Sequence, residues 1–306
     1  MNERSAPRSI EQYLDALRAA LAGEDPALVQ DALYDAEEYL RAEVAANPDR
    51  SEADTLELIA STYGAPDEVA AAYRTTEKQV RTALAPPPRK AARTALGRFF
   101  SVYSDSRAWT ALFYMLLALV TGIFYFTATV TGLSISAGLM IMIIGIPVFL
   151  LFVGFTRVLA LAEGRLVEGL LGQRMPRRPL YPSKGMPIME RIKEMLTDRR
   201  TWTTMFYFLL MLPLGILYFT IAITGIAVSL ALIFGSIASL LLGAGIGAGG
   251  ISIDNGVFFG PSPAAAPLIF IAGILLMTAM MHLVRGIGRA HGTLAKHLLV
   301  APRGAA

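Results

Sequence analysis

The segment WTALFYMLLALVTGIFYFTATVTGLSISAG, residues 109–138, carries no charged side chain. It opens an uncharged run that extends from Ala108 to Thr156. An α-helix needs about 20 mainly apolar residues to cross a bilayer, so this run is long enough for two spans. Basic residues flank the run on both sides, and the positive-inside rule therefore predicts a helical hairpin with both ends in the cytoplasm.

The composition agrees with a membrane protein. The 306 residues are 54% hydrophobic and only 17% charged, whereas soluble domains are about 25% charged. The absence of cysteine excludes disulfides, thiolate metal sites and cysteine nucleophiles. His282, His291 and His297 are scattered along the chain, and no catalytic triad or carboxylate pair is evident. We therefore expect no enzyme activity, no cofactor and no metal.

A second segment, WTTMFYFLLMLPLGILYFTIAITGIAVSLA at 202–231, repeats the first at an offset of 93 residues. Segments 156–172 and 284–300 match more weakly at an offset of 128. Such self-similarity indicates an internal duplication. We expect an all-α membrane domain over 109–300 made of two repeated helical hairpins, with repeat 1 at about 109–172 and repeat 2 at about 202–300. Identical pairs include Trp109/Trp202, Tyr114/Tyr207, Gly122/Gly215, Tyr125/Tyr218, Thr127/Thr220 and Gly132/Gly225.

The second repeat leaves the number of spans open. Basic residues occur near Arg200 and again in the C-terminal tail, so both places are expected in the cytoplasm and an even number of spans lies between them. We assign these spans to about 202–224 and 266–284, with 226–243 as a continuation, a re-entrant segment or an interfacial segment. The alternative makes 226–243 a full span, which gives five spans and an external C-terminus.

The N-terminal part has the opposite charge. Residues 1–80 hold 17 acidic and seven basic residues, whereas the rest of the chain is strongly basic. Apolar periodicity and capping residues predict four short helices in a cytoplasmic domain over 1–76, too small for a buried active site. No signal peptide is evident. The linker 77–108 contains Pro86–Pro88 and basic residues, which we expect on anionic lipid headgroups and not on nucleic acid.

The N-terminal sequences EQYLDALRAAL, ALYDAEEYLRAEV and ADTLELIASTYGAPDEVAAAYR resemble the HAAS (helix-turn-helix-associated α-helical signalling) domain. The resemblance implies a signalling module that contacts PadR-like transcriptional regulators. The acidic residues of the second helix are either a solvated face or a face that docks a partner. The candidates for partner docking are Asp35, Glu38, Gly64, Pro66 and Glu68.

Residues 100–300 resemble the "Putative sensor" membrane domain that is often attached to bacterial histidine kinases. The paired sequences GIFYFTATVTGL and GILYFTIAITGI carry this resemblance. No histidine-kinase catalytic region follows, which leaves the HAAS-like domain as the expected output. The resemblance does not define a ligand.

Aromatic and hydroxyl side chains supply the remaining candidates. Trp109 and Trp202 are expected to anchor the spans at the membrane interface. Tyr125, Thr127, Tyr218 and Thr220 lie within the spans, where they either join helices by hydrogen bonds or line a ligand pocket between the hairpins. We expect no charged residue inside a span, which argues against ion-coupled transport or a proton relay.

These features together predict a multi-pass sensor of the inner membrane with both termini in the cytoplasm. It would relay a signal from the membrane or the exterior to a cytoplasmic protein partner. The alternatives are a membrane permease or scaffold in which the N-terminal bundle acts as a regulatory cap. The sequence leaves the stimulus, the direction of signalling and homo-oligomerisation open.

Overall fold

The computed structural model describes residues 7–83, 94–142, 144–178, 193, 197–242, 251–253, 256–258 and 264–300. The fold is all-α, as predicted. Its one addition in these residues is a small antiparallel hairpin of β1 (Ile251–Ile253) and β2 (Gly256–Phe258). The prolines of the predicted linker and the glycine-rich stretch 243–250 lie outside the described residues.

Four helices form the N-terminal bundle: α1 (Ile10–Ala20), α2 (Pro26–Ala46), α3 (Glu52–Thr62) and α4 (Pro66–Ala83). Ser9, Asp25 and Ser51 cap the first three helices by accepting hydrogen bonds from backbone N–H groups. Helix α4 is longer than the short helix expected from the sequence. It continues to Ala83 because its second half contains good helix formers and no glycine or proline.

A short α5 (Ala95–Phe100) and a 3₁₀ turn η1 (Ser101–Ser104) lead into the membrane part. Its long helices are α6 (Ser106–Met140), α7 (Gly145–Leu166), α9 (Arg199–Leu242) and α10 (Ala266–Leu299). Helix α7 is extended by a π-helical turn, η2 (Val167–Leu171). All four are long and apolar enough to cross a membrane. Residues 226–242 continue α9, so the described residues hold four candidate spans and not five.

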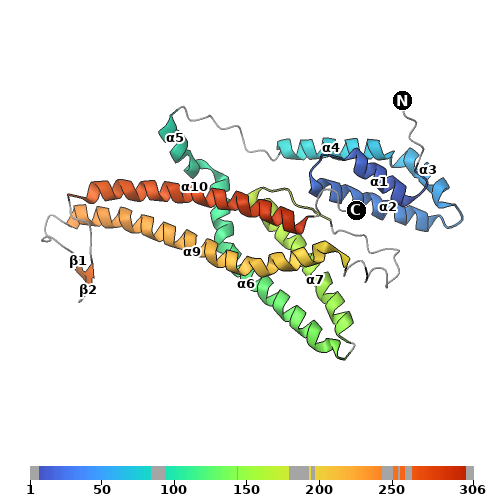
Figure 1. Ribbon diagram of the computed structural model, residues 1–306. Helices are drawn as coiled ribbons and strands as arrows, with labels where there is room; N and C mark the ends of the chain where they lie inside the picture. The colour runs from blue at the N-terminus through green and yellow to red at the C-terminus, as the bar shows by residue number, and fades with distance from the viewer. Residues whose placement is uncertain are drawn as a thin grey trace.

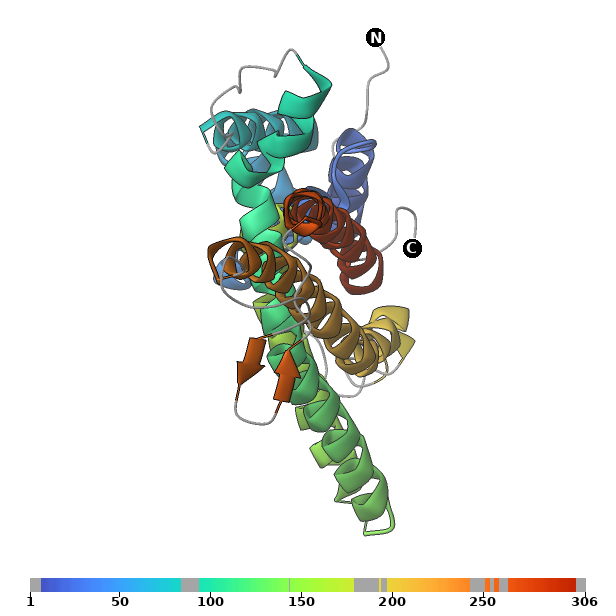
Figure 2. The same cartoon turned by 90° about the vertical axis from the view of Figure 1, so that its left-hand side faces the viewer.

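The four helices form two antiparallel hairpins, α6–α7 and α9–α10, which cross each other and then diverge (Figures 1 and 2). The crossing lies between α6 and α9. A Cβ atom built on Gly122 would stand 2.5 Å from the carbonyl oxygen of Met211, and one built on Gly215 would collide with the carbonyl oxygen of Ala118. Glycine at both positions therefore allows the two backbones to touch.

The glycine contact predicts a position-specific effect on stability. Gly122→Ala should destabilise the protein by about 1–3 kcal/mol, because backbone atoms cannot move aside as a flexible side chain can. Gly154→Ala on α7 is the matched control, since its Cβ would meet open space, and alanine favours a helix over glycine by about 1 kcal/mol. Thermal unfolding in detergent micelles compares the two variants. Equal melting temperatures would contradict the assigned crossing.

Candidate functional site

A buried polar cluster joins the two hairpins where they cross. We call it the Glu163–His291 cluster. Glu163 on α7 has no exposed surface, and His291 on α10 is 1% exposed. Four tyrosines from the other two helices surround them. The members are Glu163, His291, Tyr114 and Tyr125 on α6, and Tyr207 and Tyr218 on α9.

Two tyrosine hydroxyls bridge the acid and the base. Tyr114 and Tyr207 donate hydrogen bonds to Oε1 of Glu163, over 2.6 and 2.9 Å. The same hydroxyls lie 2.6 and 3.0 Å from Nε2 of His291. Because Tyr114 belongs to one hairpin and Tyr207 to the other, the acid and the base each bond to both hairpins.

Two further tyrosines complete the cluster, one on each side. Tyr125 donates to Oε2 of Glu163 over 3.0 Å, and the hydroxyl of Tyr218 lies 3.1 Å from Nδ1 of His291. Each ring nitrogen and each carboxylate oxygen thus has a partner. These hydrogen bonds lower the free-energy cost of burying polar groups among apolar helices.

Contacts made by residues of the first hairpin are repeated by the equivalent residues of the second hairpin. Positions 114 and 207, and 125 and 218, differ by 93 residues, and positions 163 and 291 differ by 128. The same offsets relate two ion pairs. Asp105 bonds Arg285 over 3.1 Å, and Asp198 lies 3.9 Å from Arg157. In each pair the aspartate that precedes one hairpin contacts the arginine of the other hairpin's second helix.

The N-terminal bundle contacts the membrane part through a second polar surface, which we call the docking interface. On the bundle it comprises Asp25, Gln30, Asp31, Asp35 and Glu77. On the membrane part it comprises Arg174, Arg177, Arg178, Arg200 and Lys296. Acidic and amide side chains of the bundle therefore face the basic ends of α7, α9 and α10.

Asp31 lies at the centre of the docking interface. Its carboxylate accepts hydrogen bonds from the backbone N–H groups of Arg177 and Arg178 over 2.7 and 2.9 Å. Arg174 adds a third bond over 2.9 Å. Burial raises the pKa of Asp31, and these three bonds act in the opposite direction. Burying this carboxylate costs desolvation free energy, so the contact adds little net stability. It favours one docking geometry, because any other position would leave the carboxylate without its partners.

Two ion pairs flank Asp31. Asp35 pairs with Arg178 over 2.8 Å, and its other oxygen accepts a bond from Tyr73 over 2.9 Å. Lys296 of α10 donates to Asp25 over 2.5 Å, and the same Asp25 caps α2. The α2 helix is thereby linked through one residue to the end of α10.

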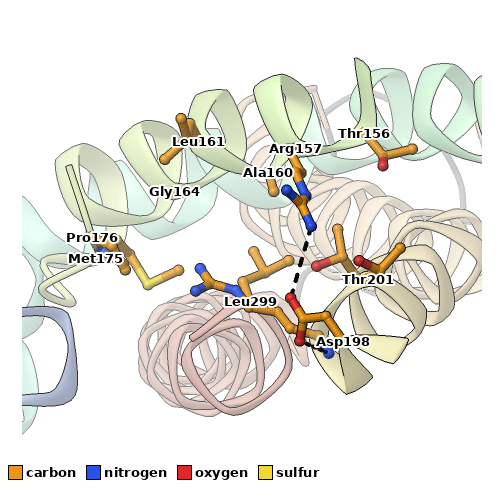
Figure 3. Close-up of a pocket in the computed structure, with 12 residues that line it drawn as sticks. Thr156, Arg157, Ala160, Leu161, Gly164, Met175, Pro176, Asp198, Thr201 and Leu299 are labelled. Carbon is orange, nitrogen blue, oxygen red and sulfur yellow. Dashed lines mark hydrogen bonds and ion pairs between the residues drawn. The ribbon is translucent and has the colours of Figure 1, made fainter. Parts of the chain in front are cut away.

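A small cavity lies between the cluster and the docking interface (Figure 3). Its volume is about 40 Å³, and α7, the start of α9 and the end of α10 line it. In Figure 3, Arg157 and Asp198 point toward each other across it. The buried Thr201 hydroxyl, which lines it, has no hydrogen-bond partner in the described part of the chain. The cavity is large enough for water, and Gly164, the neighbour of Glu163, forms part of its wall.

The structure separates the intramembrane residues predicted from the sequence. Tyr125 and Tyr218 belong to the cluster, whereas Thr127 and Thr220 lie on the exposed faces of α6 and α9. Trp109 and Trp202 are both 51% exposed near the starts of these helices.

The predicted partner-docking residues fall in two places. Asp35 lies inside the docking interface, and Glu38 is half-buried on the same helix. Gly64 lies in the turn between α3 and α4, and Pro66 and Glu68 lie in the first turn of α4. There the Glu68 carboxylate accepts a bond from a backbone N–H and the Gly64 carbonyl accepts one from Tyr13.

The expectation of spans without charge is wrong for α7. It took Arg157 as the end of the span, but the helix continues through Arg157 to Leu166 and carries Glu163 into the core. Arg157 is accommodated by Asp198. Of the three histidines, His291 joins this cluster, whereas His282 and His297 contact backbone carbonyl groups elsewhere. A signal was present in the sequence, because the offset of 128 aligns Glu163 with His291, an acid with a base.

Four apolar helices around a satisfied polar core define an α-helical membrane protein. The family model described as "Putative sensor" matches residues 114–299, more than half of the chain, so the protein belongs to this family. The resemblance to this sensor domain is thereby confirmed. The N-terminal bundle gave no match to the HAAS family. No curated protein and no solved structure matches the chain.

Loss of a bridging hydroxyl should destabilise the membrane part. Tyr114→Phe removes a partner from both Glu163 and His291, and an unsatisfied buried group costs about 1–3 kcal/mol. Tyr103→Phe is the matched control, because its hydroxyl bonds among the described residues only to Thr278, which also donates to a backbone carbonyl. Thermal unfolding in micelles should show the larger drop for Tyr114→Phe. An equal or smaller drop would exclude a bridging role.

Proposed function

We propose that the protein is a membrane sensor that transmits a change in the packing of its two hairpins to the N-terminal bundle. The docking interface carries this proposal, because it ties α2 of the bundle at once to the segment that follows α7 and η2, to the start of α9 and to the end of α10. A shift of α10 against α7 changes the distance between Lys296 and Arg174. Their partners Asp25 and Asp31 lie on or next to the single helix α2, so the two ion pairs cannot both keep their geometry. The matched contacts of the hairpins support the predicted repeat, in which two similar units change their packing at a shared centre.

The proposed topology follows from charge. Arg174, Arg177, Arg178, Arg200 and Lys296 gather at one end of the four helices, which the positive-inside rule places in the cytoplasm. The bundle and the end of α10 then lie on the cytoplasmic side of the inner membrane. The exposed apolar faces of α6 and α9, which include Phe113 and Phe206 at 57% exposure each, would contact lipid.

The proposed partner is a PadR-like transcriptional regulator, in line with the resemblance of the bundle to HAAS domains. Part of the acidic face of α2 is occupied by the chain's own arginines. Release of the bundle would uncover Asp31 and Asp35 for a basic surface on the partner. The protein then acts through binding and not through catalysis.

Weakening the docking interface should release the bundle. Asp31→Asn keeps the shape of the side chain and removes the charge that Arg174 and two backbone N–H groups bind. We expect the backbone amides of α2 to exchange hydrogen at least about tenfold faster, as a loss of about 1.4 kcal/mol implies. Asp15→Asn is the control, because the Asp15 side chain is 73% exposed and pairs with the exposed Arg18.

The exchange is measured by mass spectrometry on the full chain in lipid nanodiscs. Unchanged exchange in Asp31→Asn would show that this contact does not hold the bundle. Full-length wild type and Arg174→Gln, which loosens the contact with Asp31 and keeps both acids of α2, are then used to capture a purified PadR-like regulator from the same genome, and stronger capture by the variant is expected. If neither captures it, and liposomes with the wild type leak or exchange solute, the permease hypothesis replaces the sensor.

A further inference from the structure

We infer that the Glu163–His291 cluster is a binding site for one exchangeable proton, shared between a carboxyl and an imidazole that have two tyrosine hydroxyls in common. The inference that the cluster binds a proton stands on the geometry of the cluster. Its consequence for the bundle rests on the proposed function.

The hydrogen bonds account for every proton in one state of the cluster. Tyr114, Tyr207 and Tyr125 each give their only hydroxyl proton to the Glu163 carboxylate. The lone pairs of Tyr114 and Tyr207 then accept from His291 only if Nε2 carries hydrogen. Nδ1 is consequently bare and accepts from Tyr218. This state contains a neutral imidazole and a carboxylate, with a net charge of −1.

A second state holds one more proton with the same heavy atoms. The proton can bind Nδ1 of His291, which then donates a hydrogen bond to the Tyr218 oxygen. The Tyr218 hydroxyl rotates so that its own proton no longer points at Nδ1. The added proton can instead bind a Glu163 oxygen, which turns one tyrosine from donor to acceptor. Either choice makes the cluster electrically neutral. The two states differ by one proton, and no bond between heavy atoms is made or broken.

Burial makes the difference between the two states large. A lone charge inside a low-dielectric core costs several kcal/mol, whereas three hydrogen bonds stabilise the carboxylate. Desolvation therefore favours the neutral state, whereas the three hydrogen bonds favour the charged one.

No fixed cation among the described residues takes the place of this proton. The groups that face the cluster are Tyr114 and Tyr125 from α6, Glu163 from α7, Tyr207 and Tyr218 from α9, and His291 from α10. The nearby cations pair elsewhere: Arg157 with Asp198, Arg285 with Asp105 and Lys296 with Asp25. The charge of the cluster therefore depends on its own protons.

The cavity of Figure 3 is large enough for water and is lined by Gly164, the residue next to Glu163 in the chain. Gly164 and Ala160 of α7 line it, and Asp198 and Arg200 lie at the basic end of the helices. A proton would therefore enter from the side on which the bundle sits. That side is the cytoplasm in the proposed topology.

The same helices connect the cluster to the bundle. His291 lies one and a half turns before Lys296, which bonds Asp25 of α2. Glu163 likewise precedes Glu168, which pairs with Arg174 and Arg177 at the docking interface. Because Tyr114 and Tyr207 belong to different hairpins, a change in their bonds alters how one hairpin is held against the other.

Nuclear magnetic resonance of ¹⁵N-histidine-labelled full chain in lipid nanodiscs tests the site directly. The chain has three histidines, and the exposed His297 serves as an internal reference. Between about pH 4.5 and about pH 9, which brackets ordinary histidine titration, the His291 signals should shift in wild type. In Glu163→Gln they should show proton binding weakened by about tenfold or more, since the opposite charge is gone.

His291 signals that stay constant across this pH range would overturn the proton site. So would identical His291 titrations in wild type and Glu163→Gln. If Glu163→Gln does not fold, Tyr218→Phe replaces it. That variant keeps both the acid and the base, removes only the partner of Nδ1, and should shift the His291 titration. An unchanged titration in Tyr218→Phe would also overturn the site.

Hydrogen exchange of α2 across the same pH range separates this inference from the proposed function. Titration of His291 with a matching change in α2 exchange, lost in Glu163→Gln, supports both. Titration without any change in α2 leaves the proton site standing and contradicts the relay. A constant His291 combined with release of the bundle in Asp31→Asn contradicts the proton site and leaves the relay standing.

Discussion

The backbone contact of α6 with α9 is the constraint on which the rest of the membrane part depends. Helices normally pack with axes about 8–10 Å apart. Glycine at positions 122 and 215 lets each helix approach the carbonyl groups of the other. Tyr114 and Tyr207 lie about two turns before this contact, so their hydroxyls reach Glu163 and His291 together. With wider spacing, each tyrosine would reach only its own hairpin.

Two polar surfaces of different kinds are stacked along these helices. The Glu163–His291 cluster is buried, and tyrosine hydroxyls bond each carboxylate oxygen and each ring nitrogen. The docking interface is ionic and sits at the basic ends of the helices, where Arg174 and Asp31 are about one-tenth exposed. A buried ion pair adds little net stability but penalises wrong geometries strongly. The bundle can therefore be held in one position and still be released by a small change in its partners.

Much of the fold was predictable because apolar runs and their charged flanks are local features. The four long helices and the four helices of the bundle follow from them. The limits of the spans did not follow. Helix α9 continues through 226–242, one of the alternatives that the sequence left open, because no proline interrupts this stretch. Helix α7 carries Arg157 past the expected end of the span, and Asp198, which is far along the chain, lies 3.9 Å from it. A rule that ends a span at its first charged residue uses only neighbouring residues, so it does not take account of a counter-ion that is distant in the sequence.

The sequence by itself determined the composition of the membrane helices, the charge opposition between bundle and membrane part, and the repeated tyrosines and glycines. Each is a property of neighbouring residues or of an internal alignment. Only the tertiary structure decided that four tyrosines meet one acid and one base, and that α2 turns its acids toward the chain's own arginines. Those contacts join residues from different helices, and their positions depend on how closely two backbones can approach.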